Sequence, residues 1–377
     1  MKRIDNIYNE ILVYEHALNM FHKIKRNCKN KEAVYNFRLN LNTNIFNILT
    51  KLYKGEYKFS YYRIFMIRDP KYRIIMSENI SDKLVNHLVS KYILLPCLES
   101  KLIDTNVATR INKGSSYAFK KFIEYINKLK YLNKNIYILK IDIKKYFYNI
   151  DHEIIFNKLK KYIKDKKALS LLKTIINSTN EKYVNERIEF LKKEKINYIK
   201  SLNISDNEKT KKIKTINEIP LYEYNKGLPI GNMTSQILAI FYLNDVDHFI
   251  KDELKYKYYI RYMDDLLIID TDKYKLKENF KLIEKKINEL KLSTNAKSNI
   301  YKLNNGISFL GYIFKIDKNN KLLIRYNNKT IRRINKKLDN LYLYDYEKYL
   351  RSTGSYKGYL KLCNTNLKTD LEKKYNY

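Results

Sequence analysis

Apolar residues recur at three- and four-residue spacing along much of the chain, which predicts helices over residues 5–53. The stretch 57–76 instead alternates on either side of Arg-Asp-Pro-Lys and predicts a hairpin with an Asp-Pro turn. Helical spacing returns over 77–102, with Ser77 or Ser81 as the N-cap. The first hundred residues therefore read as helices with one small hairpin.

The middle of the chain predicts a buried strand followed by a helix. The stretch 135–147 has a central apolar run, its strand ends at Asp142, and Asp151 can cap the helix that follows. Residues 179–218 are rich in Lys, Glu and Asn. We interpret them as a charged helical insertion or a mobile loop with a solvated face.

The second half predicts a sheet built from distant strands. Strands at 136–142, 257–262 and 266–270, with helices after the first and last, predict a mixed sheet covered on one face. The remaining predicted elements are a Gly-Pro loop and apolar helix over 227–250, a helix over 275–291, a strand pair over 306–314 and basic helices from about 327 onward.

Charge is the strongest global signal in the composition. The 377 residues hold 75 Lys and Arg against 40 Asp and Glu, a net charge of +35. Such a charge repels itself in the compact state, so a polyanionic partner is the natural offset. Because no apolar span or basic amphipathic helix is evident, we expect nucleic acid and not a membrane as that partner.

Cysteine usage favours a reducing compartment. Cys28, Cys97 and Cys363 lie far apart, lack the spacing of metal ligands and form an odd set. The N-terminal residues become charged at once, unlike a signal peptide. We expect a cytoplasmic protein.

Seven motifs in a fixed order give the chain a family resemblance. They are YRIIM, DTNVATRINKGSSYAF, KIDIKKYFYNIDH, GLPIGNMTSQILAIFYLNDVD, YMDD, NAKSNIY and FLGY. Together they resemble the fingers, palm, lysine and primer-grip motifs of reverse transcriptases, from about residue 57 to 365. YMDD alone is weak evidence, whereas seven ordered matches are strong.

The resemblance implies an α+β fold, the right-hand polymerase of fingers, palm and thumb, with an antiparallel or mixed palm sheet packed on helices. The expected parts are a helical N-terminal extension (1–56), fingers (57–135), a palm (136–315) with the charged insertion at about 179–218, and a helical thumb (320–377).

Three carboxylates carry the expected chemistry. Asp264 and Asp265 stand side by side at the tip of a predicted hairpin, although adjacent Asp residues repel and Asp is a poor strand former. With Asp142 they would project to one edge of the sheet and hold two Mg²⁺ ions, with Mn²⁺ as a substitute. The alternative is a solvent-exposed turn that happens to contain Asp-Asp. The expected metal set also includes Ile143, beside Asp142.

Other matched positions imply how the nucleotide is bound. Phe147 matches the steric gate that excludes a ribose 2′-hydroxyl, and its alternative is a core aromatic at a strand end. Arg73, with Lys71 nearby, matches the clamp on the triphosphate, and Arg110 resembles the second fingers arginine. Lys297 matches the lysine that protonates departing pyrophosphate.

One departure from the usual pattern narrows the subtype. The Gly-Pro loop carries Ile230 where most reverse transcriptases have Gln, and Gln236 where most have Pro. That combination resembles the enzymes of diversity-generating retroelements, which copy RNA with errors at adenines. Ile offers only shape where a Gln amide can hydrogen-bond, so discrimination between nucleotides weakens.

The resemblance also implies a nucleic-acid track. The thumb basic residues repeat at helical spacing and would follow a duplex backbone, or else form an ordinary solvated helix face. The expected contacts are Tyr262, Met263, Phe309, Leu310, Gly311, Lys329, Arg332, Arg333 and Lys336.

The function that follows is RNA-directed DNA synthesis, with template RNA, cDNA and dNTPs as partners. An added noncoding RNA or a small basic accessory protein remains open. The alternatives are a defence-associated reverse transcriptase that works with a noncoding RNA, a non-catalytic RNA-binding protein on a polymerase fold, and an RNA-synthesising polymerase.

Overall fold

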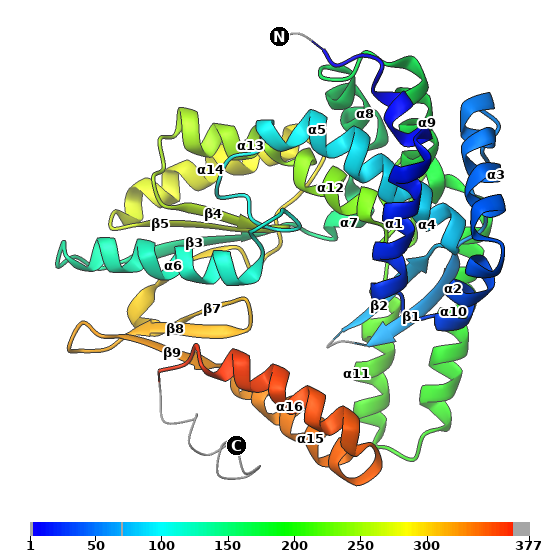
Figure 1. Cartoon of the computed structure of the whole chain (residues 1–377). Helices are drawn as coiled ribbons and strands as arrows, with labels where there is room; N and C mark the ends of the chain where they lie inside the picture. The colour runs from blue at the N-terminus through cyan, green and yellow to red at the C-terminus, as the bar shows by residue number, and fades with distance from the viewer. Residues whose placement is uncertain (1–2, 69–70, 365–377) are drawn as a thin grey trace. The chain divides into compact units, whose positions relative to one another are not determined.

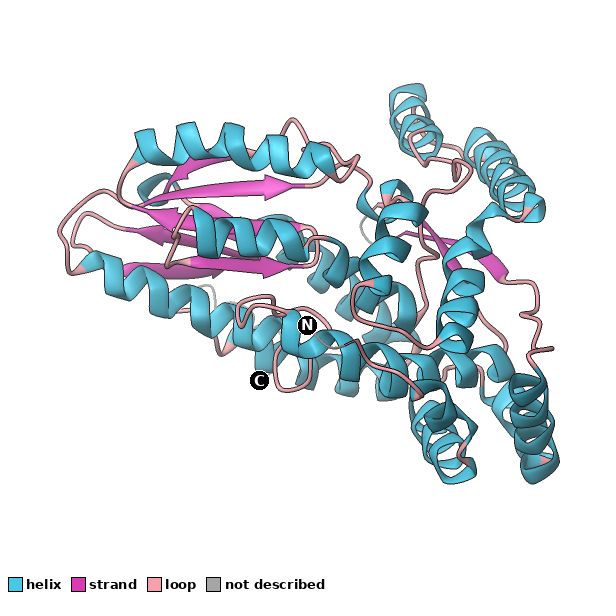
Figure 2. Cartoon of the chain, turned by 90° about the horizontal axis from the view of Figure 1, so that it is seen from above, coloured by secondary structure: helices cyan, strands magenta, loops and turns pink. Residues whose placement is uncertain are grey.

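The computed structural model describes residues 3–68 and 71–364 of the chain (Figure 1). The predicted Asp69–Pro70 turn lies outside these described residues, and so does the end of the predicted thumb after residue 364. The described chain contains both helices and antiparallel strands, so the structure is mixed helix and sheet, as expected for an α+β protein (Figure 2). No helix within these described ranges is long and apolar enough to cross a membrane.

The chain forms two compact units, and each is described by itself. The first contains residues 1–109, 143–253 and 283–294, and the second contains residues 110–142, 254–282 and 295–377. Because the chain passes between them several times, each unit joins segments that lie far apart in the sequence.

The N-terminal helices form part of the core of the first unit. After a short 3₁₀ helix at Ile7–Leu12, the chain forms α1 (Tyr14–Asn27), α2 (Lys31–Leu39) and α3 (Leu41–Lys54), which confirms the helical prediction for this region. The apolar spacing that predicts α1 is the spacing of its buried face, which carries Ala17, Met20, Phe21 and Ile24.

A hairpin and an interrupted helix follow. Strand β1 (Arg63–Arg68) pairs antiparallel with β2 (Tyr72–Ser77), as predicted. The N-cap of α4 (Ile80–Val89) is neither Ser77 nor Ser81: the Asn79 side chain accepts a hydrogen bond from the backbone N–H of Asp82 at 2.7 Å. The predicted helix over 77–102 is interrupted, because a π-helical turn at Ser90–Leu94 separates α4 from α5 (Leu95–Leu98).

The rest of the first unit is helical. Asp151 caps α8, as predicted, by accepting from the N–H of Ile154 at 3.0 Å. The Gly-Pro loop leads into α12, which buries nearly all of its residues. The helices here are α7 (Tyr146–Asn149), α8 (His152–Lys160), α9 (Lys166–Ile176), α12 (Met233–Tyr242) and α13 (Asn244–His248), followed by a π turn at Phe249–Glu253.

The charged insertion is a pair of helices, α10 (Lys182–Ser201) and α11 (Asp206–Asn217). This confirms the first of the two predicted forms, a helical insertion, and excludes the mobile loop, but one face of α10 is buried and not solvated. Val184 and Ile188 of α10 are buried in one cluster with Ile64 and Ile74 of the β1–β2 hairpin. This apolar contact fixes α10 against the hairpin.

The second unit contains a four-stranded sheet in the order β4-β5-β3-β6. All of its pairings are antiparallel, which agrees with the first of the two expected arrangements, antiparallel or mixed, and β6 was not predicted as a strand. Successive residues 266–269 of β5 are all buried, so both faces of the sheet are covered, not one. Its strands are β3 (Tyr137–Asp142), β4 (Tyr259–Tyr262), β5 (Asp265–Asp270) and β6 (Asn299–Lys302).

Helices α6 (Ser115–Lys130) and α14 (Lys273–Glu289) lie on opposite sides of this sheet (Figure 1). On its other side α6 packs on a second antiparallel sheet, β7-β8-β9, through Phe122, whose ring lies 5.3 Å from Phe309 and 4.8 Å from Phe314. The strands are β7 (Ile307–Phe309), β8 (Tyr312–Ile316) and β9 (Leu322–Tyr326), of which β9 was not predicted.

The chain then forms a helical hairpin, α15 (Asn328–Tyr344) and α16 (Tyr346–Leu360). Ile334 and Leu338 of α15 pack on Tyr349 of α16 in a small buried cluster. The basic helical region predicted from about residue 327 is therefore confirmed as far as residue 360.

Candidate active site

Strand register brings the predicted carboxylates of the second unit together. Asp142, the last residue of β3, lies directly opposite Asp265, the first residue of β5. On the other side of β5, Tyr262 pairs with Asp265, which leaves Met263 and Asp264 as a two-residue turn. Side chains directly opposite each other have Cβ atoms about 4.5–5.5 Å apart, and like charges there destabilise the sheet. Two carboxylates and a third on the adjoining turn thus share one edge of the sheet.

The turn that carries Asp264 is held in an unusual conformation. Met263 has φ 55°, in the left-handed region that bulky residues rarely adopt. The side chain of Arg261, which is fully buried, donates a hydrogen bond from Nη1 to the carbonyl oxygen of Met263 at 2.9 Å. The sequence analysis did not single out Arg261, although a cation between Ile260 and Tyr262 in a short buried strand indicates a residue with a specific polar partner.

The backbone of Asp142 is fixed by a turn from a distant segment. The N–H of Asn295 donates to the Asp142 carbonyl oxygen at 2.7 Å, and the Asp142 N–H donates to Ser298 Oγ at 3.1 Å. These two residues belong to the NAKSNIY motif, in which we had singled out Lys297. Lys297 itself is exposed, and its N–H donates to the Asn295 side chain at 3.3 Å.

A lysine partly offsets the negative charge at this edge. Lys140 Nζ lies 3.6 Å from Asp265 Oδ1 and also donates to the Ser308 carbonyl oxygen at 3.1 Å. Within the described ranges, no three His, Cys, Asp or Glu side chains are gathered into a ready-made metal site. The donor set fits Mg²⁺ all the same, because that ion takes one or two protein carboxylates and completes its shell with water and substrate phosphate.

The first unit brings together Phe147, Ile230 and the strand that carries Arg73, three of the positions predicted to bind the nucleotide. The N–H of Leu228 donates to the Phe147 carbonyl oxygen at 2.7 Å, so the Gly-Pro loop runs beside α7. Two residues further on, the Ile230 carbonyl oxygen accepts from the N–H of Met76 at 2.9 Å, which joins the loop to β2. Phe147 and Ile230 are both half-buried, and the strand that carries Arg73 is the loop's neighbour.

The close approach of loop and strand depends on a glycine. Gly231 has φ +142°, and a Cβ at this position would lie 2.5 Å from the Met76 carbonyl oxygen.

Gln236 lies with Gly231 and Glu78 in the lining of a hollow of about 330 Å³. Burial raises the pKa of Glu78 to about 8, against the opposing charge of Lys83.

Arg73 and Lys71 are exposed at the start of β2. Burial raises the pKa of Tyr148 to about 12, and the charge of Arg73 opposes that rise. Arg110 is half-buried and is the first residue of the second unit. Ile143 is buried in the first unit, where its backbone forms a β-bridge with Thr294.

His152, the neighbour of Asp151 in the sequence, is a core residue and not a surface one. The residue is buried, and its Nε2 lies 2.7 Å from the Gly227 carbonyl oxygen, which also accepts from Thr179 Oγ1 at 3.0 Å. Burial lowers the pKa of His152. A neutral imidazole that donates to the loop therefore helps to hold the Gly-Pro segment.

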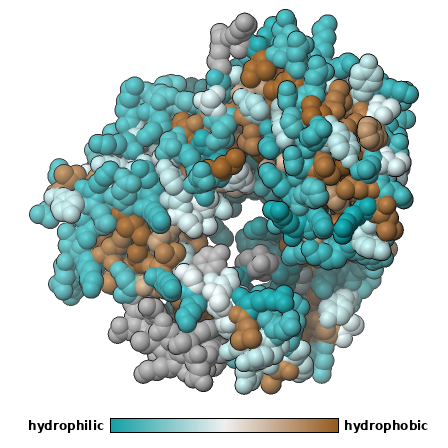
Figure 3. Space-filling model, viewed as in Figure 1, coloured by the Kyte–Doolittle hydropathy of each residue, from teal (hydrophilic) through white to brown (hydrophobic). Residues whose placement is uncertain are grey.

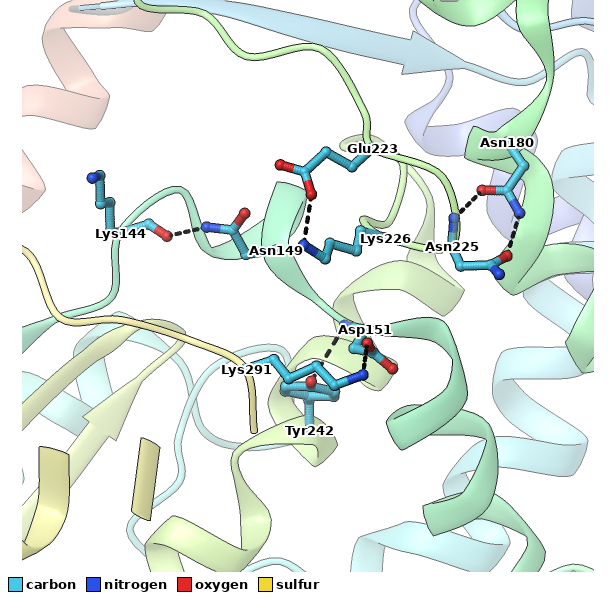
Figure 4. Close-up of polar contacts among 9 residues, drawn as sticks. All are labelled: Lys144, Asn149, Asp151, Asn180, Glu223, Asn225, Lys226, Tyr242 and Lys291. Atoms are coloured by element: carbon cyan, nitrogen blue, oxygen red, sulfur yellow. Dashed lines mark hydrogen bonds and ion pairs between the residues drawn. The ribbon is translucent and has the colours of Figure 1, made fainter. Parts of the chain in front are cut away.

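Asp151 anchors the same region of the first unit (Figure 4). Its carboxylate pairs with Lys291 Nζ at 2.7 Å, and its N–H donates to the hydroxyl of Tyr242 at 3.2 Å. Although burial raises the pKa of Asp151, the hydrogen bonds from Lys291 and Ile154 hold it below its ordinary value. Asp151 is thus a charged cap tied to two distant segments.

The predicted nucleic-acid contacts of the second unit lie either on the strands and their turns or on helix α15. Phe309 is buried against α6, so its side chain supports the β7–β8 hairpin and is not open to a ligand. Leu310 and Gly311 form the turn, with φ 49° and 87°, and Tyr262 is half-buried at the end of β4. The basic residues Lys329, Arg332, Arg333 and Lys336 are all exposed on α15, away from buried Ile331, Ile334 and Leu338.

Comparison with known protein families places most of the chain in one of them. A family model described as reverse transcriptase (RNA-dependent DNA polymerase) matches residues 67–314, more than half of the 377-residue chain. None of the curated proteins compared with the chain matches it. The matched range contains all three carboxylates, the Gly-Pro loop and most of the β1–β2 hairpin.

Proposed function

The chain belongs to the reverse transcriptase family, the RNA-dependent DNA polymerases, and we propose that Asp142, Asp264 and Asp265 are its catalytic carboxylates. The observation that carries this proposal is the register of the palm sheet, which sets Asp142 opposite Asp265 beside the Asp264 turn. Two like charges across a strand pair cost stability, so a site that keeps both is expected to bind a cation.

The three carboxylates would hold two Mg²⁺ ions, with Mn²⁺ as a substitute. When bound, such ions would supply activation of the primer 3′-hydroxyl and neutralisation of charge on the triphosphate. The protein's own part is to keep the carboxylates in place. It does so through the Asn295 and Ser298 contacts to Asp142 and the Arg261 contact to the turn.

The decisive experiment is primer extension with dNTPs on a primed RNA template in Mg²⁺. We expect incorporation by the wild type and none by Asp264→Ala/Asp265→Ala. Asp206→Asn is the matched control, because Asp206 is an exposed aspartate in the first turn of α11 and should leave incorporation unchanged. Incorporation by the double variant would remove these residues from the catalytic role.

Sugar selection is assigned to Phe147. The Gly-Pro loop holds its backbone, as expected of a residue that must keep its ring in one position against a ribose 2′-hydroxyl. Phe147→Ala should raise rNTP use relative to dNTP use. Equal loss with both substrates would make Phe147 a core aromatic only, and a wild type that prefers rNTPs would identify an RNA-synthesising polymerase.

Error-prone synthesis, as in diversity-generating retroelements, is the proposed specialisation. It is supported by Ile230, which joins the loop to β2 through its carbonyl oxygen while its side chain offers the nucleotide no hydrogen bond. Misincorporation opposite template adenine should fall in Ile230→Gln, and equal error rates would exclude this role for Ile230.

Copurifying RNA and cDNA distinguish the two biological settings. Sequencing should show a gene segment scrambled at adenines if the enzyme diversifies a target. A repetitive or phage-triggered product would instead support the defence-associated alternative, in which the enzyme works with a noncoding RNA. A small basic protein that copurifies would be the accessory subunit.

A further inference from the structure

An open hollow of about 480 Å³ lies in the first unit, where the chain enters β1 beside α10. Its volume falls within the range of about 300–1,000 Å³ that is typical of ligand pockets. No motif accounts for it, and half of its wall comes from the charged insertion. The lining residues are Tyr61, Tyr62, Arg63, Ile64, Tyr183, Glu186, Arg187 and Phe190.

Two aromatic side chains of the hollow face solvent. Tyr61 is 77% exposed and Phe190 is 48% exposed, although large aromatic rings gain most from burial. The Tyr61 ring is held by Tyr183, with the two ring centroids 4.5 Å apart and the planes inclined at 63°. The Tyr183 hydroxyl in turn accepts from the N–H of Tyr62 at 2.9 Å. Tyr61 is therefore positioned from one side and open on the rest of its surface.

The wall is rigid because its inner side belongs to the core. Val184 and Ile188, on the same helix as Tyr183 and Phe190, are buried against Ile64. Phe190 thus sits on a helix that is packed against β1, and Tyr61 lies two residues before that strand, which limits the entropy lost when a ligand binds.

The charges at the rim favour a phosphate backbone. The Arg187 guanidinium carbon lies 4.8 Å from the centre of the Phe190 ring, and Arg63 is exposed beside them. Glu186 is the one acidic residue of the lining, and its carboxylate lies 3.5 Å from Lys182 Nζ. The lining therefore has two arginines and one carboxylate, and that carboxylate is already paired with a lysine.

We propose that this hollow binds an unpaired stretch of RNA, with bases stacked on Tyr61 and Phe190 and the backbone held by Arg63 and Arg187. Open aromatic rings combined with arginines are the features by which proteins hold single strands, because every base offers a stacking face. A duplex hides those faces, so paired RNA should not use the site. The net charge of +35 supplies the long-range attraction.

The proposal adds to the proposed function without depending on catalysis, and binding is therefore measured in the Asp264→Ala/Asp265→Ala background. The probe is a fluorescein-labelled single-stranded RNA of mixed sequence, titrated in fluorescence anisotropy. The same RNA annealed to its complement is the duplex control. Failure of dNTP incorporation elsewhere would leave this measurement intact.

Removal of each ring tests the stacking. Tyr61→Ala and Phe190→Ala should each weaken single-strand binding by about 5- to 150-fold, the loss measured when a base loses its aromatic partner. Tyr61→Phe keeps the ring and should bind like the parent. Tyr274→Ala removes a tyrosine that is 83% exposed on α14, outside the hollow, and should also bind like the parent.

Two further results complete the test. Thermal melting of the Ala variants should match the parent, because both deleted side chains are exposed, and duplex affinity should not change. Unchanged single-strand affinity in both Ala variants would overturn the proposal. Equal losses for single strand and duplex would overturn it as well, because they would indicate backbone binding without stacking.

Discussion

Arg261 offers the sharpest test of how the fold supports the turn that carries the proposed catalytic residue Asp264. It is the largest fully buried side chain in the described part of the chain, and its guanidinium donates to the Met263 carbonyl oxygen at 2.9 Å. Met263 adopts a left-handed conformation between Tyr262 and Asp264. The guanidinium thus stabilises a turn in which Met263 holds a backbone conformation that is unfavourable for a bulky residue.

The variant Arg261→Met keeps the length of the side chain and removes the donor. A hydrogen bond from a charged donor contributes about 1.5–3 kcal/mol to stability. With an unfolding entropy of about 2.1 cal/mol/K per residue, a chain of 377 residues loses about 1.3 °C per kcal/mol, so the melting temperature should fall by about 2–4 °C. The larger effect should be on catalysis, because a reacting group displaced by about 1 Å can cost ~100-fold in rate.

The assay is steady-state dNTP incorporation at a temperature well below the melting point of every variant. We expect kcat for Arg261→Met to fall by about 10- to 100-fold with little change in the KM for dNTP, because the turn bears on the chemical step. Arg325→Met is the matched control, since Arg325 is exposed on β9. If Arg261→Met melts early yet keeps the wild-type kcat, the guanidinium supports the fold and not the turn.

Three further outcomes follow from contacts described above. Gly231→Ala should lower the melting temperature and cut incorporation, because its Cβ would stand 2.5 Å from the Met76 carbonyl oxygen at a φ of +142°; a normal melt and rate would contradict this. Glu78 has a folded pKa of about 8 against 4.5 unfolded, so its contribution to stability is fully present below pH 4.5 and falls by up to about 1.4 kcal/mol per pH unit towards pH 8. Urea unfolding of Glu78→Gln should lack that decline. In EDTA, Asp142→Asn should be about 0.2–1 kcal/mol more stable to unfolding than the wild type, because the repulsion between residue 142 and Asp265 is gone. The same variant should incorporate no dNTP in Mg²⁺. Equal stability of the two proteins would mean that the Asp142–Asp265 pair does not repel.

Local pattern was enough for much of the fold. The 3.6-residue spacing of buried positions predicted α1 and the N-terminal helices, and alternation predicted the β1–β2 hairpin. A hydrogen bond between residues three positions apart can also be predicted from local sequence, which is why the prediction that Asp151 caps α8 was correct. The ordered motifs further predicted the family and the identity of the three candidate carboxylates.

Only the tertiary structure decided what those residues face. The opposition of Asp142 and Asp265 is a matter of strand register between distant segments, and the burial of Arg261 and His152 depends on elements that pack over them. Composition made the insertion look solvated, yet one apolar face of α10 is buried against β1. The physical reason is the same in each case: spacing along a chain reports which side of an element is apolar, whereas register and burial depend on contacts that the element makes with residues far away in the sequence.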